Sequence, residues 1–288
     1  MAMIAAFLAW SIYWYIGLSM AQSVADRELH RAAANGTTVS CRRESWGGFP
    51  FRFEFRCANP IVKSSHGITA SAESLQVLAQ AYNPKHLILL LDGPIAITHG
   101  SSGLQMASEG RATASVKFGP DPLPQISVEV PAPTISGLAH SGLLLFHLRS
   151  EEDDALGIAI SAENLIFALM PPLVIDRADA VASLHRDQTL EIHSIELLKQ
   201  ATIYKGSGTL GLDSERRVAG TLQTDTNDLD GLLRIVDPYL QLSDQQRLAF
   251  KSVLGMLGQE AKAAIIAKNG ELYLGPFKLG DLAPVDWR

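Results

Sequence analysis

The chain has 288 residues, which is enough to bury a sizeable core and does not by itself require more than one domain. Charged residues make up 19% of the chain, hydrophobic residues make up 47%, and the formal net charge is -6. This balance provides no basic patch of the kind that neutralises phosphates, so nucleic acid is excluded as an expected partner.

The N-terminal segment is apolar and carries no charged side chain before Asp26. A helix of about 20 apolar residues crosses a hydrocarbon core of about 30 Å. We therefore expect residues 1–22 to form a transmembrane anchor, with the membrane contacted through residues 1–20, and residues 23–36 to form a linker.

A cleaved signal peptide is the alternative for this segment. Ser19, Met20 and Ala21 supply the small residues of a signal-peptidase site, although the charged start of a signal peptide is missing. Whether the chain is cleaved after Ala21 stays open, and both interpretations export the residues that follow.

The two cysteines of the chain, Cys41 and Cys57, lie on either side of a Gly-Gly-Phe-Pro turn. A hairpin at this turn brings their β-carbons within bonding range, so we expect a disulfide. Two reduced, buried thiols are the alternative. A disulfide requires an oxidising compartment, which agrees with export.

From Thr37 onward, short alternating segments are separated by Gly, Pro, Asn and Asp, which is typical of antiparallel strands. The pattern indicates a single extracytoplasmic β-rich domain over residues 37–288. Strands are expected over 39–43, 49–57, 68–81, 86–98, 104–118, 125–130, 143–149, 155–169, 189–196, 201–212 and 218–223.

Two helices are expected near the C-terminus, the first over about 228–236. The second begins at a capping box of Ser243 and Gln246 and ends at Asn269-Gly270. Its apolar stripe has helical spacing and comprises Phe250, Val253, Leu254, Leu257, Ala261, Ala264 and Ile265. The predicted fold is α+β: an N-terminal transmembrane helix followed by a large curled, mainly antiparallel β-sheet packed on a C-terminal amphipathic helix.

No motif in the chain predicts a catalytic or ligand-binding site. The eight histidines are scattered, and the GxGxxG match at Gly206–Gly211 continues a strand pattern instead of opening a helix. The acidic cluster over 225–230 lacks the ligand spacing of a calcium loop, and its residues are expected to cap the short helix. We therefore expect no enzyme activity, no metal, no cofactor and no nucleotide.

The two cysteines flank the sequence Trp46-Gly-Gly-Phe-Pro-Phe-Arg52, and this hairpin directly follows an apolar segment. The motif resembles domain of unknown function 2125 (DUF2125), an alphaproteobacterial family. Further matching segments are Tyr82–Leu87, Asp92–Pro94, Gly206–Asp213 and Gly270–Pro276. The resemblance implies a membrane-anchored envelope protein of unassigned activity, and it transfers no catalytic residue. Together with the apolar segment and the cysteines, it leads us to expect a single-pass protein of the bacterial inner membrane with its body in the periplasm. The unit over 206–236 is also loosely similar to AsmA-like envelope proteins, whose curved sheets are associated with lipid handling.

Two functional hypotheses follow. The first is a structural or protein-interaction module in the cell envelope, docking through sheet edges or through the turn Phe49, Pro50, Phe51 and Arg52. The alternative is an apolar groove in the curled sheet that binds lipid or another apolar envelope component. The candidate groove residues are Leu87, Leu89, Leu91, Leu143 and Leu145.

Overall fold

The computed structural model describes residues 1–100, 102–121, 123–151, 154–239, 252, 261–274 and 277–285. The chain divides into two compact units, Met1–Gly137 and Leu138–Arg288, each built mainly from antiparallel strands. The cysteine hairpin and the apolar helix both belong to the first unit.

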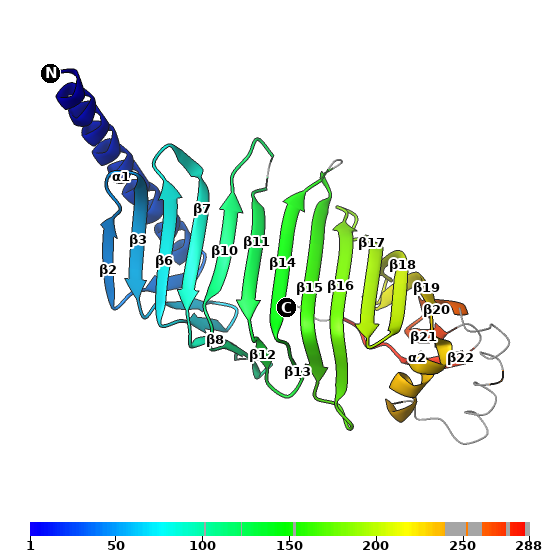
Figure 1. The fold of residues 1–288 in the computed structure, drawn as a ribbon. Coiled ribbons are helices and arrows are strands. Elements are labelled where there is room, and N and C mark those ends of the chain that lie inside the picture. Colours follow the sequence, from blue (N-terminus) through cyan, green and yellow to red (C-terminus); the bar gives the residue numbers. More distant parts are fainter. Residues whose placement is uncertain are drawn as a thin grey trace. The chain divides into compact units, whose positions relative to one another are not determined.

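The first unit begins with one long helix, α1 (Ala2–Ala34), drawn in dark blue in Figure 1. The expected linker over 23–36 is therefore mostly helical, because its Ala, Arg, Glu and Leu residues have high helix propensity and no Gly or Pro interrupts them. The helix ends at Asn35, and Gly36 follows with a φ of 77°, a left-handed conformation that glycine adopts without steric cost.

The strands of the first unit form two rows in which neighbouring strands are antiparallel. One row has the order β2-β3-β6-β7-β10-β11, and the other has the order β1-β4-β5-β8-β9-β12. Figure 1 shows the first row side by side. The bounds are β1 (Thr37–Ser40), β2 (Arg43–Gly47), β3 (Arg52–Ala58), β4 (Ile61–Ser64), β5 (Ile68–Ser71), β6 (Ser74–Gln80), β7 (Asn83–Asp92), β8 (Ile95–His99), β9 (Leu104–Ser108), β10 (Ala112–Lys117), β11 (Gln125–Pro131) and β12 (Thr134–Ile135).

The two rows meet at short breaks between successive strands. Asn59 and Ala132 adopt positive φ at the β3–β4 and β11–β12 breaks, and Gly93-Pro94 separates β7 from β8. The expected long strands over 68–81, 86–98 and 104–118 are each two strands, with breaks at 72–73, 93–94 and 109–111. Such breaks bend the chain, so that one segment serves both rows.

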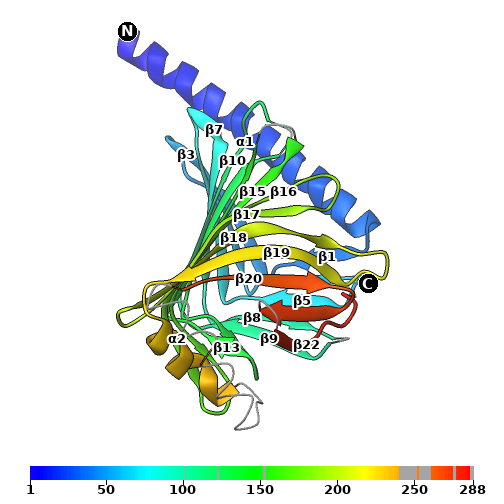
Figure 2. The ribbon, with the colours of Figure 1, turned by 90° about the vertical axis from the view of Figure 1, so that its right-hand side faces the viewer.

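The second unit is a meander in which consecutive strands from β14 to β22 pair with one another. Figure 2 shows β18, β19 and β20 side by side. The bounds are β13 (Ala139–His140), β14 (Leu143–Ser150), β15 (Leu156–Phe167), β16 (Leu173–Leu184), β17 (Leu190–Lys199), β18 (Thr202–Leu212), β19 (Val218–Thr226), α2 (Leu229–Val236), the 3-10 turn Asp237–Tyr239, β20 (Ala261–Lys268), β21 (Glu271–Leu274) and β22 (Phe277–Asp281). The expected short helix is thus confirmed as α2.

The expected C-terminal amphipathic helix is wrong over its last part. Ala261, Ala264 and Ile265 lie in β20, where Ala264 pairs with Gln223 and Ile265 with Leu222 of β19. Asn269-Gly270 is the turn of the β20–β21 hairpin, and both residues have positive φ. Asn-Gly between two apolar runs is a strong hairpin signal, which outweighs the helical spacing of the alanines. The rest of that expected helix, from Ser243 to Leu257, lies outside the described residues apart from position 252.

The α+β class is confirmed: an apolar N-terminal helix, a large antiparallel sheet and a short C-terminal helix.

Candidate functional site

The first row of the first unit has a continuous apolar area on one face, formed by three alternate positions on each of β3, β6, β7, β10 and β11. At its edges, Glu44 of β2 lies opposite Cys57, and Lys85 precedes Leu87 on the same side of β7. Leu89 of β7 lies between Val77 of β6 and Ala114 of β10, and Leu87 and Leu91 occupy equivalent places one pleat away. Cross-strand neighbours share a face, so the register defines the whole set. The apolar face of the first unit comprises Phe53, Phe55, Cys57, Leu75, Val77, Ala79, Leu87, Leu89, Leu91, Ala112, Ala114, Val116, Ile126, Val128 and Val130.

This face is only partly covered. Phe53, Cys57, Ala79 and Ala112 are buried, whereas the leucines of β7 keep part of their surface exposed. A large apolar surface that remains partly exposed is typical of a binding site. The three predicted groove residues of β7 therefore lie together on a surface suited to an apolar ligand.

The opposite face of the same strands is mixed: it carries the charged and polar residues together with Leu78, Ile88 and Leu90, and Glu54 of β3 is its best-buried charge. Only 4% of the Glu54 side chain is exposed, Arg52 Nη2 lies 3.0 Å from Glu54 Oε2, and Arg56 and Gln76 donate hydrogen bonds to Glu54 Oε1. Burial raises the pKa of this carboxyl, but the donors and the two arginine charges outweigh burial and hold the pKa below its ordinary value of 4.5.

The second unit likewise has one apolar face and one mixed face. Phe146 of β14 pairs with Ile160 of β15, which pairs with Ala180 of β16 and then Ile195 of β17. The apolar face of the second unit comprises Leu144, Phe146, Leu148, Ile158, Ile160, Ala162, Ala178, Ala180, Ala182, Ile192, Ile195 and Leu197. Ile160 is 41% exposed, so this face is also incompletely covered.

The predicted groove residues Leu143 and Leu145 lie on the other face of β14. Leu143 pairs with Glu163 and Leu145 with Ser161, so both share a surface with polar residues. Four apolar residues in a row, Leu143 to Phe146, give no alternation from which to choose a face. The apolar face of β14 is formed instead by Leu144, Phe146 and Leu148.

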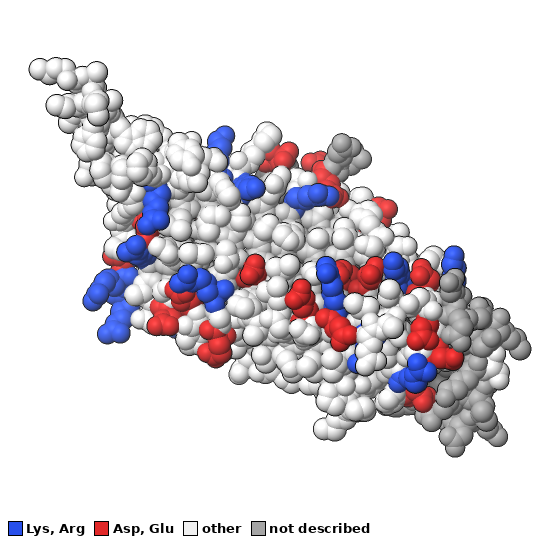
Figure 3. Space-filling model, in the orientation of Figure 1, with Lys and Arg blue, Asp and Glu red and all other residues white. Residues whose placement is uncertain are grey.

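Charged residues of both signs are interspersed over the body, as Figure 3 shows for one side of the molecule. The N-terminal end of α1, at the upper left of that view, carries none, in agreement with the uncharged sequence before Asp26. The surface of the body is therefore charged, whereas the N-terminal end of α1 is apolar.

A pocket of about 310 Å³ lies beside α2 in the second unit. It is lined by Pro171, Pro172, Leu173, Val174, Lys199, Gln200, Thr202, Gly231, Arg234, Ile235, Pro238 and Tyr239. The Lys199 ammonium donates to the Val174 carbonyl at 2.7 Å, so this cation already has a protein acceptor.

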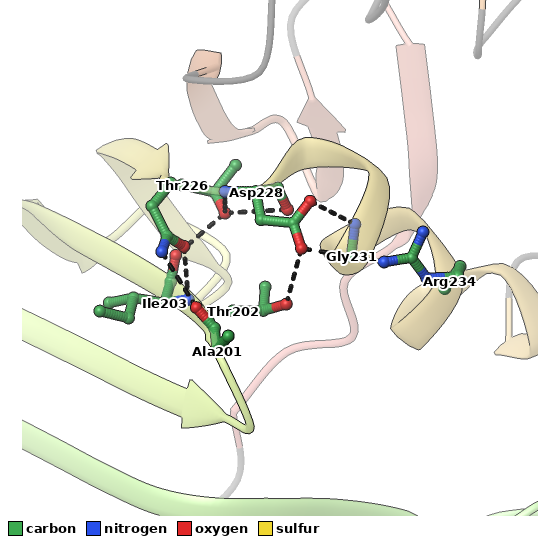
Figure 4. Close-up of polar contacts among 8 residues, drawn as sticks. Ala201, Thr202, Ile203, Thr226, Asp228, Gly231 and Arg234 are labelled. Carbon is green, nitrogen blue, oxygen red and sulfur yellow. Dashed lines mark hydrogen bonds and ion pairs between the residues drawn. The ribbon is translucent and has the colours of Figure 1, made fainter.

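The polar network next to the pocket caps α2, as Figure 4 shows. Asp228 Oδ1 accepts from the Gly231 amide at 2.8 Å, and Asp228 Oδ2 accepts from Thr202 Oγ1 at 3.2 Å. Arg234 Nη2 lies 3.8 Å from Asp228 Oδ2. Capping by the acidic cluster is thus confirmed for Asp228, and the described residues contain no group of three or more His, Cys, Asp and Glu that could hold a metal.

A serine–histidine pair that the sequence did not reveal lies on the mixed face of the second unit. Ser183 Oγ is 2.7 Å from His193 Nε2 and 2.5 Å from Glu151 Oε2. The serine has one proton, and the carboxylate is its stronger acceptor, so His193 donates to the serine and does not act as its base. The hydroxyl of Ser183, followed by the guanidinium of Arg149, lowers the pKa of Glu151. In this arrangement Ser183 is not activated as a nucleophile.

The expected disulfide is present: Cys41 and Cys57 are bonded, with their Cα atoms 5.4 Å apart. The turn that they flank connects β2 to β3 and carries the exposed rings of Phe49 and Phe51. Pro50 at its centre accepts a hydrogen bond from the Trp10 ring of α1 at 2.8 Å. The predicted docking turn is therefore in contact with the N-terminal helix.

The protein is of the α+β class with a β-rich body. Its N-terminal helix is apolar and long enough to cross a membrane, and each of its antiparallel sheets has one apolar face. Length and composition alone also fit a signal sequence. The chain belongs to the family described as uncharacterized protein conserved in bacteria (DUF2125), whose sequence profile matches residues 14–149 and residues 146–283. No curated protein and no solved structure matches the chain. The looser similarity to AsmA-like proteins stays a prediction.

Proposed function

We propose that this protein binds an acyl chain, or another apolar component of the bacterial envelope, along the apolar faces of its sheets. The observation that carries the proposal is the apolar face of the first unit, where three alternate positions on each of five neighbouring strands are all apolar. A binding role fits this surface better than a catalytic one.

The dimensions and the energetics of the face suit an extended hydrocarbon chain. Strands lie about 4.8 Å apart, so five strands provide a surface about 20 Å across. Each CH₂ group that leaves water contributes about 0.8 kcal/mol, and a chain laid across several strands accumulates this gain without any polar contact.

The proposed location is the inner membrane, with the body in the periplasm. Two features support it: α1 is apolar enough to span a bilayer, and the disulfide of the β2–β3 hairpin requires an oxidising compartment. A site next to a membrane also has acyl chains within reach.

Burial of Trp14 favours an anchor over a cleaved signal. This side chain is 3% exposed and packs on Phe53 and Ala81 of the body, so cleavage after Ala21 removes part of the core of the first unit. We propose that the mature protein retains α1.

The structural or protein-interaction role stays a prediction. Its favoured surface, the turn from Phe49 to Arg52, already contacts α1 through the carbonyls of Pro50 and Arg52. The apolar faces are larger, and the leucines of β7 remain partly exposed on the first of them.

Photocrosslinking tests acyl-chain binding. The full chain is reconstituted into vesicles that contain a phospholipid with a photoactivatable acyl chain, and crosslinked peptides are mapped by mass spectrometry. We expect crosslinks on β6, β7 and β10 in addition to α1. Crosslinks confined to α1 contradict the proposal.

A matched pair of variants on β7 controls for general damage to the sheet. Leu89 points to the apolar face, whereas its neighbour Ile88 shares the other face with Ser115. Leu89→Gln is expected to reduce crosslinking to β7 and β10 several-fold, and Ile88→Gln is expected to leave it unchanged. Equal losses in both variants contradict a role of the apolar face.

A further inference from the structure

Helix α1 is fixed to the body by its aromatic side chains. Three ring donors bind backbone carbonyls: Trp10 Nε1 donates to Pro50 O at 2.8 Å, Tyr13 Oη to Ala81 O at 2.7 Å, and Trp14 Nε1 to Arg52 O at 2.9 Å. All three carbonyls lie at one end of the first row, in the β2–β3 turn, at the start of β3 and after β6.

Close packing reinforces these hydrogen bonds. The Trp14 and Phe53 rings lie with centroids 5.9 Å apart, and the helix approaches Phe53 at Gly17. A Cβ atom at Gly17 would lie 2.6 Å from the Phe53 ring, so only glycine permits this distance. The helix and the turn therefore form one packed unit, and α1 is more than a flexible tether.

This unit exposes a continuous aromatic surface. The Phe49 ring lies 6.2 Å from Phe7, 5.3 Å from Trp14 and 6.3 Å from Tyr15, measured between ring centroids. Phe49 is 42% exposed and Phe51 is 68% exposed, although both are large and apolar. An exposed apolar surface of this kind indicates contact with a membrane or a partner.

The hydrogen bonds and the ring types of this unit fit a bilayer. In a bilayer, carbonyl groups must find donors within the protein, because no water is available. Here Pro50, Arg52 and Ala81 each receive a hydrogen bond from a Trp or Tyr ring, so these carbonyls are satisfied without water. Trp and Tyr are the residues enriched at membrane interfaces.

The distribution of charged residues also agrees with insertion of this unit into a bilayer. Neither the sequence before Asp26 nor the turn segment Trp46–Phe51 contains a charged residue. The first charge after the turn is Arg52, whose side chain is 54% exposed and pairs with Glu54. An arginine at this position is placed to contact lipid headgroups while the rings before it lie deeper.

We propose that the turn Gly47–Phe51 inserts into the lipid bilayer together with the N-terminal part of α1, with Arg52 at the headgroup level. In this proposal the aromatic surface contacts the lipid bilayer and no protein partner. The turn and α1 would thus hold one end of the first row against the membrane, whether or not the apolar faces bind lipid.

Depth-dependent fluorescence quenching tests the insertion. Both cysteines among the described residues are bonded to each other, so Phe51→Cys introduces one free thiol for an environment-sensitive fluorophore. The labelled full chain is reconstituted into phosphatidylcholine–phosphatidylglycerol vesicles. It is then exposed to nitroxide-labelled lipids and, separately, to aqueous iodide. Mass spectrometry verifies that the native disulfide is intact.

Ser65→Cys is the matched control. Ser65 is exposed in the β4–β5 turn, and its amide binds the Gly36 carbonyl at the other end of α1. We expect the label at position 51 to lose most of its fluorescence to nitroxide lipids and little to iodide, and the label at position 65 to behave in the opposite way.

Two results would overturn the proposal. Quenching of position 51 by iodide, without quenching by nitroxide lipids, places the turn in water. Protection of position 51 from both quenchers means that protein covers it. Neither result bears on acyl-chain crosslinking to β7 and β10, so failure of this proposal is distinguishable from failure of the proposed function.

Discussion

At the residue scale, Glu54 links the stability of the first unit to pH. Burial raises the pKa of this carboxyl, but the donors Gln76 and Arg56 and the charge of Arg52 outweigh burial and hold the folded-state pKa below its ordinary value of 4.5. The stabilisation is therefore complete above about pH 4.5 and is lost as the pH falls through the folded pKa.

Glu54→Gln tests this linkage. The substitution removes a charged acceptor that two donors share, and we expect a loss of about 1–3 kcal/mol in the free energy of unfolding at pH 7. The difference from the native protein should shrink as the pH falls toward about 3, measured by urea unfolding at several pH values. A difference that is constant across this range contradicts the assignment.

The cap of α2 rests on one carboxylate. Asp228→Ala removes the acceptor of the Gly231 amide and should destabilise the second unit by about 1 kcal/mol. Hydrogen exchange of the α2 amides measures the loss. Asp225→Ala, an exposed position on the same β19, is the control and should leave exchange in α2 unchanged.

At the element scale, the docking of α1 depends on the absence of a side chain at Gly17. Gly17→Val places carbon atoms where the Phe53 ring lies and should cost about 1–3 kcal/mol through overpacking. We expect the emission wavelength of Trp14 to shift as its ring leaves Phe53 and becomes exposed to the surroundings of α1. Ser19→Val, two residues along on the exposed side of the helix, should not shift it.

The β2–β3 hairpin is held by its disulfide. By the loop-entropy model, a bridge across 16 residues contributes about 3 kcal/mol. Urea unfolding with and without a reductant should show this difference for the native protein. The double variant Cys41→Ala/Cys57→Ala should be insensitive to reductant, and sensitivity in that variant would mean that the reductant acts elsewhere.

Several elements could be predicted from local sequence because their signals are local. The length of the uncharged segment predicts α1, the spacing of the cysteines around a turn predicts the hairpin, and Asp228 before an apolar run predicts α2. The aromatic contacts of Trp10, Trp14 and Phe49 were not predicted, because they join residues about 40 positions apart.

The predictions for other elements were wrong where two local signals compete. β20 has both helical spacing of apolar residues and an Asn-Gly hairpin turn after it, and pairing with β19 decides in favour of the strand. In β14 the run from Leu143 to Phe146 fits either face, and only the register with β15 shows which leucines lie on the apolar face. Register depends on the partner strand and cannot be read from one segment.

At the scale of the whole molecule, each unit independently contains an antiparallel sheet with one apolar face and one face that carries the charged residues. A soluble body normally buries such a face, because exposed hydrocarbon is costly in water. We therefore assign an apolar ligand to these faces and a bilayer to the aromatic turn. Both assignments fit a chain whose N-terminal helix can cross a membrane.

Native mass spectrometry tests the binding of an acyl lipid most directly. The full chain is extracted from membranes and released from detergent, and its solvent extract is analysed in parallel. We predict a co-purified acyl lipid at near-stoichiometric amount in the native protein, retained in Ile88→Gln and depleted in Leu89→Gln. A native protein that is compact and free of lipid would contradict the proposed function.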